Sequence, residues 1–367
     1  MPVRAQITGW GKYLPSHTVT NAELAETIDT SDEWIRQRTG IGERRIARQS
    51  ESTAEMAVHA ARDALRKAMV DPNEVGLVIV ATSTPDQTFP SMASIVQFAV
   101  GANRAGAFDL SAACSGFVYA LSMASDAICA GSINAALIIG AEKMSNVVDW
   151  SDRNTCVLFG DGAGAIVLQA GDDRAGVLAT VLGSDGSDSE ALVLRHKVGE
   201  DSSLRGPFVT MDGRRVFRFA SRIMASAIQQ VTARVDLSVA DISLVIPHQA
   251  NQRIMDTACE QLAYPRDKVY SNLERYGNTS AASVPIALCE AAEEGLTQDG
   301  ALIALVAFGG GLSWGAALVR WGKAARPVWH VALRGRGRLL WAALLWQWRR
   351  LLRLARRRWP RKPRPPA

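Results

Sequence analysis

The sequence has few cysteines, and their positions follow no pattern. Five occur in 367 residues, at Cys114, Cys129, Cys156, Cys259 and Cys289. They show neither the paired spacing of a zinc site nor that of a disulfide framework. The N-terminus also lacks the apolar stretch of a secretory signal peptide. We therefore expect a cytoplasmic protein without a metal or a redox cofactor.

Acidic residues are absent from the end of the chain. Residues 324–367, here called the tail, contain thirteen Lys and Arg, five of the ten Trp, and no Asp or Glu. Residues 1–323 then hold 28 basic and 36 acidic residues, a net charge of −8, although the whole chain carries +5. This change of composition places a domain boundary near Lys323.

The tail also lacks a long apolar run. Its longest, 339–346, has eight residues, whereas a membrane-spanning helix needs about 20. Residues 338–359 have helical spacing, with Trp341 and Trp348 on one stripe and arginines on the other faces. A basic amphipathic helix with tryptophan is typical of peripheral binding to a membrane surface. Contact with nucleic acid is a less favoured alternative, and a solvated extension without a role is another.

Residues 1–323 contain a weak internal repeat. Short continuous apolar segments alternate with helices of small residues, a pattern typical of sheets covered on both faces. We expect strands at 76–81, 106–110, 136–140 and 162–168 in a first half, 1–170, and at 243–248, 301–306 and 313–319 in a second half, 171–323. The shared order of elements predicts two related α/β halves packed around a pseudo-dyad.

Cys114 lies at a predicted strand-to-helix corner, between the strand 106–110 and a helix at 117–129. Unpaired N–H groups and the positive end of the helix dipole favour a thiolate at such a place. A cysteine between small residues is also common as an inert buried side chain. The other motifs of the chain must therefore decide between the two readings.

Three further segments offer polar groups for chemistry. His248 ends a predicted buried strand, Asn278 lies in the equivalent corner of the second half, and 309–311 is a glycine triplet after a strand. Their plain readings are a structural histidine, a helix cap and a tight turn. Their functional reading is a cleft that both corners face, with a glycine N–H offered to an oxyanion.

One further motif is rejected as a functional site. Residues 160–165 fit the dinucleotide pattern GxGxxA but lead into a strand instead of a helix. In a dinucleotide site the pattern follows a strand and leads into a helix. We therefore interpret this segment as a turn.

The motifs together resemble the β-ketoacyl-acyl carrier protein synthase III family, which has the thiolase fold. The resemblance rests on Ser111-Ala-Ala-Cys-Ser-Gly-Phe117, Pro247-His-Gln-Ala-Asn251, Gly277-Asn-Thr-Ser-Ala-Ala-Ser283 and Phe308-Gly-Gly-Gly311, with 29–35 and 38–41, and it runs from about residue 3 to Trp321. It implies an α/β protein of two related halves in a layered αβαβα arrangement. The tail has no counterpart in the family's usual pattern.

The resemblance implies an acyltransferase that starts fatty acid synthesis. Cys114 would take an acyl group, normally acetyl, from acyl-coenzyme A, and malonyl-acyl carrier protein would lose carbon dioxide and attack the acyl-cysteine. His248 and Asn278 would hydrogen-bond the malonyl thioester oxygen during decarboxylation. The N–H groups of Cys114 and Gly310 would hold the tetrahedral oxyanion. No metal or redox cofactor takes part.

The resemblance also implies binding residues. Trp34 and Arg153 would clamp the adenine of coenzyme A, and Arg38 would meet phosphate. A homodimer is implied, in which Phe89 enters the partner's acyl pocket, itself lined by Met144 and Phe159. Acidic acyl carrier protein would dock on Arg214, Arg215, Arg218, Arg222 and Arg253. One departure is Glu260-Gln261, where some members have a basic pair.

Two alternatives differ in function. One is an enzyme of the same fold in specialised metabolism, with another acyl primer or with coenzyme A in place of the carrier. The other is a non-catalytic, membrane-associated scaffold. The intact set of Cys114, His248 and Asn278 argues against the scaffold. Asn278 as third member favours the priming branch, because elongating synthases resemble a Cys-His-His pattern and thiolases use a second reactive cysteine.

Overall fold

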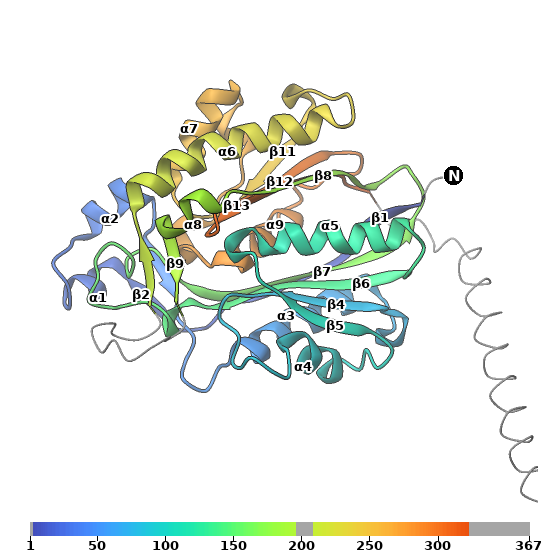
Figure 1. The fold of residues 1–367 in the computed structure, drawn as a ribbon, viewed down its shortest axis with the longest axis horizontal. Helices are drawn as coiled ribbons and strands as arrows, with labels where there is room; N and C mark the ends of the chain where they lie inside the picture. The colour runs from blue at the N-terminus through green and yellow to red at the C-terminus, as the bar shows by residue number, and fades with distance from the viewer. Residues whose placement is uncertain (1–2, 196–207, 323–367) are drawn as a thin grey trace, which may run out of the picture. The chain divides into compact units, whose positions relative to one another are not determined.

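Two β-sheets form the framework of the chain (Figure 1). The computed structural model describes residues 3–195 and 208–322. Contacts within the chain group Met1–Arg326 into one unit and Pro327–Ala367 into a second. The tail, with the helix predicted at 338–359, lies outside the described residues. No helix within the described ranges is long and apolar enough to cross a membrane.

The first sheet has five strands in the order β1-β7-β6-β4-β5. Its members are β1 (Arg4–Tyr13), β7 (Asp161–Gly171), β6 (Ala135–Lys143), β4 (Leu77–Ala81) and β5 (Gly106–Leu110). Strands β6, β4 and β5 run parallel, whereas β1, β7 and β6 pair antiparallel. The strands β4 and β6 are almost wholly buried, as their continuous apolar sequences predict.

The second sheet has four strands in the order β11-β12-β13-β8. They are β11 (Leu244–Pro247), β12 (Leu302–Gly309), β13 (Ser313–Arg320) and β8 (Gly176–Ser184). Only the β11–β12 pair is parallel. The sheets take their strands from separate stretches of the chain.

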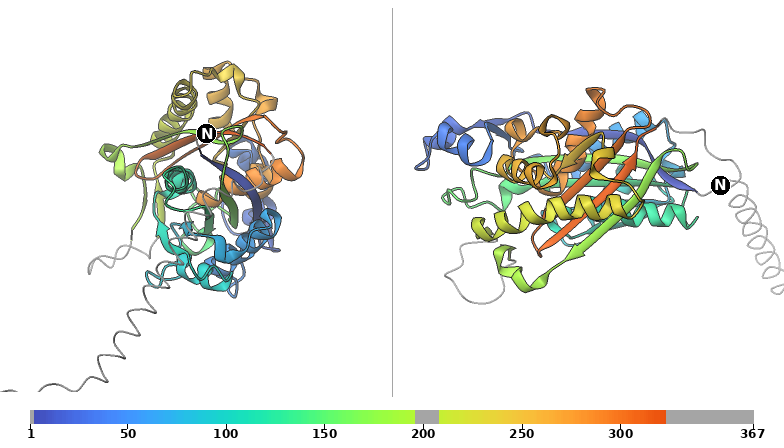
Figure 2. Two further views of the ribbon diagram at one scale, coloured as in Figure 1. Left: turned by 90° about the vertical axis from the view of Figure 1, so that its right-hand side faces the viewer. Right: turned by 90° about the horizontal axis from the view of Figure 1, so that it is seen from above.

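Helices cover both faces of each sheet, which gives the predicted αβαβα layers. Between the sheets lie α5 (Gly116–Cys129) and α9 (Ser283–Glu293) (Figure 1). The outer face of the first sheet carries α3 (Thr53–Ala68) and α4 (Met92–Ala99). The second sheet is covered by α6 (Gly213–Ala233), which lies across its orange strands in the view from above (Figure 2), and α6 packs on α7 (Gln252–Leu262).

Shorter elements complete the described chain. They are β2 (Thr18–Thr20), β3 (Glu43–Arg45), β9 (Leu192–Leu194), β10 (Val209–Met211), α1 (Asn21–Ala25), α2 (Asp32–Thr39) and α8 (Leu273–Tyr276). Strand β2 pairs with β3, and β9 pairs with β10. Two 3-10 turns matter for the site, η2 (Ala113–Ser115) and η7 (Ser280–Ala282).

The structure confirms every strand expected from the apolar pattern and the helix expected at 117–129, with small shifts at the ends. Six strands were not expected: β1 and β8 of the two main sheets, and the short strands β2, β3, β9 and β10. The reading of 160–165 as a turn is wrong from Asp161 onward, because these residues already belong to β7. The glycines there admit a neighbouring helix: a Cβ at Gly164 would lie 2.6 Å from the backbone nitrogen of Ile286 in α9.

Candidate active site

Cys114 lies in η2, between the end of β5 and the start of α5. Its neighbour Ala113 has a φ of 46°, a left-handed conformation that turns the chain sharply at this point. The Cys114 side chain is 7% exposed. Burial raises the pKa of its thiol to about 12, so burial outweighs the helix end that the sequence suggested would favour a thiolate. At neutral pH the resting group is a thiol.

The end of β12 packs directly on the backbone of Cys114. A Cβ built on Gly309 would lie 2.6 Å from the Cys114 backbone nitrogen, so only glycine fits there. Gly309 lines the pocket described below, whereas Gly310 does not. A Cβ on Gly310 would instead meet the backbone oxygen of Leu192 at 3.0 Å. The oxyanion role of Gly310 stays a prediction.

His248 follows β11 and is 2% exposed. Its Nδ1 lies 2.6 Å from the hydroxyl oxygen of Ser283, the first residue of α9. The ring of Phe308 meets the imidazole edge-on, with the ring centroids 5.2 Å apart. Burial lowers the pKa of His248 to about 3, so the imidazole is neutral at neutral pH.

Asn278 joins the two halves at the site. Its backbone N–H donates to Leu158 at 2.8 Å, and its carbonyl accepts from Gly160 at 3.0 Å. Its side-chain Oδ1 accepts from the backbone N–H of Ser280 at 2.8 Å. Because Oδ1 is an acceptor there, the amide is oriented with its Nδ2 donor on the other side.

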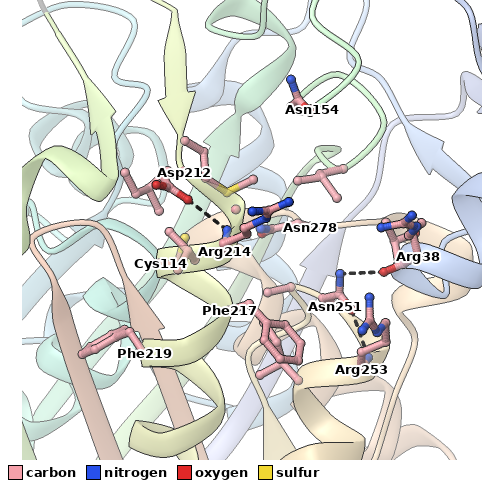
Figure 3. Close-up of a pocket in the computed structure, with 18 of the residues that line it drawn as sticks. Arg38, Cys114, Asn154, Asp212, Arg214, Phe217, Phe219, Asn251, Arg253 and Asn278 are labelled. Carbon is pink, nitrogen blue, oxygen red and sulfur yellow. Dashed lines mark hydrogen bonds between the residues drawn. The ribbon is translucent and has the colours of Figure 1, made fainter.

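One pocket of about 970 Å³ brings Cys114, His248 and Asn278 together. Cys114 comes from the first half, and the other two come from the second, as the internal repeat predicts. Figure 3 shows Cys114, Asn278 and Arg214 among the side chains that line this pocket. The pocket lining also includes Phe159, one of the residues expected in the acyl pocket.

An aromatic and two cations lie together elsewhere on the lining. The Trp34 ring has the guanidinium of Arg153 at 5.0 Å and that of Arg38 at 5.7 Å from its centroid. Arg153 also donates to the backbone oxygen of Asp29 at 2.7 Å. These three residues are the ones expected to bind coenzyme A, and the structure places them side by side.

Positive charge dominates the lining. Five arginines line the pocket, namely Arg38, Arg153, Arg214, Arg218 and Arg253, and Asp212 is the sole acid among the described residues that do so. Asp212 caps α6, where its carboxylate accepts from the backbone N–H groups of Arg214 and Arg215. The pocket is therefore suited to an anionic ligand. In residues 3–195 and 208–322, no group of three His, Cys, Asp or Glu could hold a metal ion.

Besides Gly310, four predicted site residues lie off this lining. Phe89 is 84% exposed in the segment before α4. Met144 is buried in a hydrophobic cluster. Arg215 forms an ion pair with Asp188, and Arg222 is exposed on α6. Their predicted roles in the acyl pocket and in carrier docking remain predictions.

Sequence reasoning missed three polar groups that contact the site residues. Ser283 contacts His248, and Ser280 accepts a hydrogen bond from the Cys114 thiol, with Sγ and Oγ 3.4 Å apart. Glu142, at the end of β6, accepts from the Ser280 hydroxyl at 2.9 Å. The two serines lie inside the motif 277–283, so that motif was the signal. Nothing in the local sequence marks Glu142.

Comparison with known proteins gives one family. The family model "3-Oxoacyl-[acyl-carrier-protein (ACP)] synthase III" matches residues 108–186, and the model of its C-terminal part matches 232–321. A β-ketoacyl-[acyl-carrier-protein] synthase III from Paramagnetospirillum magneticum is 50% identical over 325 residues, which cover 87% of this chain and all of the relative.

Solved structures agree with the sequence comparison. The 3-oxoacyl-[acyl-carrier-protein] synthase III of Aquifex aeolicus is 48% identical with a TM-score of 0.82, over 86% of this chain and 100% of that one. The priming β-ketosynthase of the R1128 polyketide biosynthetic pathway is 38% identical with a TM-score of 0.84, over 89% and 99%. The chain thus belongs to the β-ketoacyl-[acyl-carrier-protein] synthase III family, and it has the thiolase fold of that family.

Proposed function

We propose that this protein transfers an acyl group from acyl-coenzyme A to Cys114 and condenses it with malonyl-acyl carrier protein. The product is a β-ketoacyl-acyl carrier protein, which starts fatty acid synthesis. The observation that carries the proposal is the meeting of Cys114, His248 and Asn278 on one pocket from two halves of the chain. Family membership supports the same reaction.

In the first half-reaction the Cys114 sulfur attacks the thioester carbon. The acyl group moves to sulfur, and the coenzyme A thiol leaves with the proton that Cys114 gives up. The tetrahedral intermediate carries an oxyanion, which the N–H groups of Cys114 and Gly310 would stabilise.

In the second half-reaction the malonyl group loses carbon dioxide, and negative charge develops on its thioester oxygen. A neutral imidazole and a neutral amide stabilise this charge as hydrogen-bond donors without titrating. If the Ser283 hydroxyl donates to Nδ1, the His248 proton sits on Nε2 and is available to the substrate. The Nδ2 group of Asn278 supplies the second donor. The resulting carbanion attacks the acyl-cysteine and frees Cys114.

The arginines of the pocket support anionic substrates. Arg153 and Arg38 flank Trp34, which offers an indole face for adenine. Arg214, Arg218 and Arg253 would meet the phosphate of the pantetheine arm or the acidic carrier protein.

Assembly is a further part of the proposal. Exposed Phe89, with exposed Phe98 on nearby α4, supports a homodimer in which these rings are covered. Cytoplasmic placement and peripheral membrane contact through 338–359 rest on the sequence alone.

A second candidate is a priming ketosynthase of specialised metabolism. The likeness to the 38% identical priming β-ketosynthase of the R1128 polyketide pathway favours this alternative. The two candidates share the chemistry at Cys114 and differ in the acyl primer or the acceptor.

A panel of substrates tests the proposal. The protein is mixed with acyl-coenzyme A thioesters of different length and branching, then with malonyl-acyl carrier protein or malonyl-coenzyme A, and the products are identified by mass spectrometry. We expect a β-ketoacyl-acyl carrier protein, formed best from acetyl-coenzyme A. Preference for another primer, or for malonyl-coenzyme A, would favour the second candidate. Absence of any condensation product would refute both.

A further inference from the structure

Glu142 is a buried carboxylic acid beside Cys114 that the proposed mechanism leaves without a task. It is the last residue but one of β6 in the first sheet, and its side chain is fully buried. It makes no ion pair with any described residue. The neighbouring cation, Lys143, directs its Nζ to the backbone oxygens of Arg48 and Glu51 instead. A buried acid without a counter-ion is costly unless it is fully hydrogen-bonded.

Hydroxyl and N–H donors surround this carboxyl group. Oε2 accepts from the Thr84 hydroxyl at 2.6 Å and from the Thr82 hydroxyl at 3.3 Å, and Ser83 donates its backbone N–H at 3.1 Å. Oε1 accepts from the Ser280 hydroxyl at 2.9 Å. Donors thus face both carboxyl oxygens, and these hydrogen bonds favour the ionised form. Burial has the larger effect and raises the pKa of Glu142, which makes its carboxylate a stronger base than an exposed one.

Two hydrogen bonds connect the Cys114 thiol to the Glu142 carboxylate through Ser280, and in each the donor is on the thiol side. The Ser280 hydroxyl has a single proton, and it donates that proton to Glu142. Its lone pair therefore accepts the S–H of Cys114, with sulfur and oxygen 3.4 Å apart. Ser280 is fixed in this place because its φ is 49° and its backbone N–H is bound to Asn278.

The thiol needs an acceptor for its proton. Burial holds the pKa of Cys114 at about 12, so little thiolate exists at neutral pH. His248 makes no hydrogen bond to Cys114 in the part of the chain that the structure describes. Burial also lowers the pKa of the His248 ring to about 3, so the ring is a weak base. The Ser280–Glu142 pair is the acceptor that the Cys114 thiol contacts.

We propose that Ser280 and Glu142 form a proton relay that serves Cys114 during acyl transfer. The proposal rests on the proposed function of Cys114 as nucleophile. As the sulfur–carbon bond forms, the S–H proton moves to the Ser280 oxygen, and the Ser280 proton moves to Glu142. When coenzyme A leaves as a thiolate, the proton returns through Ser280 and ends on that thiolate. Ser280 and Glu142 finish unchanged. Ser280 is a catalytic residue in this scheme, and Glu142 is a positioning residue that acts through it.

A purely electrostatic role for Glu142 predicts the opposite sign. A nearby negative charge raises the pKa of the Cys114 thiol. Removal of that charge would then make Cys114 more reactive at neutral pH. A relay instead makes Cys114 less reactive when the acceptor is removed.

The test measures the rate at which Cys114 reacts with iodoacetamide, followed by peptide mass mapping, and the rate of its acylation by acetyl-coenzyme A, both from pH 6 to pH 10. The variants are Glu142→Gln, Ser280→Ala and the double variant. Ser115→Ala is the matched control, since Ser115 is adjacent to Cys114 but binds Ser313 and the Ala112 carbonyl. Circular dichroism and thermal unfolding check that each variant folds.

We expect both single variants to slow both reactions at pH 7 by at least about tenfold. This threshold is smaller than the effect usually ascribed to general base catalysis. The difference in rate between each variant and the wild type becomes smaller as the pH rises, because hydroxide then removes the thiol proton in place of the relay. The double variant is no slower than either single variant, because the two residues act as one unit. The control stays within about twofold of the wild type.

Equal or faster alkylation of Glu142→Gln at pH 7 would overturn the relay and leave Glu142 as a charge that raises the thiol pKa. If Glu142→Gln does not fold, Ser280→Ala decides, since it removes one hydroxyl; unchanged rates in that variant would also overturn the proposal. Alkylation needs no acyl donor. A wild-type protein that is alkylated on Cys114 but takes up no acyl group would refute the proposed function and leave the relay result readable.

Discussion

His248 Nδ1 lies 2.6 Å from the hydroxyl oxygen of Ser283, a contact that joins the residue after β11 to the first residue of α9. The contact occupies one ring nitrogen and fixes the plane of the imidazole toward the pocket. It ties the tautomer of His248 to a side chain that lies off the pocket lining.

Loss of this contact should affect one half-reaction. We predict that Ser283→Ala slows condensation by about fivefold, the effect of losing a hydrogen bond worth roughly 1 kcal/mol, and leaves acylation of Cys114 unchanged. Rapid-quench measurement of acyl-enzyme and product separates the two steps. Ser122→Ala is the control, since that hydroxyl binds Thr180. Slower acylation in Ser283→Ala would show that the contact serves Cys114 as well.

His248 and Asn278 should serve decarboxylation more than acylation. We predict that His248→Ala and Asn278→Ala still form acyl-Cys114, while condensation falls by at least ~10²-fold, as is typical for the loss of an oxyanion donor. The measurement is acyl-enzyme by intact mass and carbon dioxide release from malonyl-acyl carrier protein. Equal losses in both half-reactions would refute this division of labour.

Burial of His248 should make the protein sensitive to acid. Its pKa falls from 6.5 to about 3 on folding, so the unfolded chain binds a proton that the folded chain refuses. The contribution of His248 to stability is complete above about pH 6.5 and is lost as the pH falls toward 3. We predict that the free energy of unfolding falls less steeply over this range in His248→Gln than in the wild type. His17→Gln, at an exposed position, is the control and should keep the wild-type slope. Identical slopes in all three proteins would contradict the burial argument.

The stack on Trp34 should act on binding of coenzyme A. We predict that Trp34→Ala and Arg153→Ala each raise the KM for acetyl-coenzyme A by about tenfold, with kcat little changed, because in the proposed function they would contact the ligand away from the reacting atoms. Arg215→Ala is the control, since Arg215 pairs with Asp188 off the pocket. An unchanged KM in both variants would place the adenine elsewhere.

The tail should bind membranes without affecting catalysis. We predict that a chain ending at Lys323 keeps its turnover. The full chain should sediment with anionic vesicles at low salt and be released in part at high salt, because thirteen basic residues contribute roughly 1 kcal/mol each near anionic lipid and the tryptophans add apolar contact. Failure to bind such vesicles would refute the membrane idea. Preferential binding to nucleic acid would favour the alternative.

Much of the fold could be predicted because its central strands are continuous apolar runs. Strand β5 has the predicted bounds, and α5 begins one residue earlier than expected. Strand β1 escaped prediction because it contains Gly9, Gly11 and several polar residues, which weaken strand propensity. Those glycines are explained only by the tertiary structure: a Cβ at Gly9 would collide with the backbone of Ala64 in α3.

The candidate site was predictable as far as its motifs extend. Cys114, His248 and Asn278 each lie in a segment with its own local signature, and they share one pocket. Glu142 lies two residues past the predicted end of its strand and meets Ser280 138 residues further along the chain. No local pattern records such a contact, because it exists only once the two halves have packed together.

The measurement that tests the account most directly is the site of acylation. The wild-type protein is mixed with acetyl-coenzyme A, quenched, digested and analysed by mass spectrometry, with Cys114→Ala in parallel. We predict one acetyl group, on Cys114, and none on a folded Cys114→Ala protein. An acetyl group on Cys129, Cys156, Cys259 or Cys289, or an unlabelled wild-type protein, would contradict it.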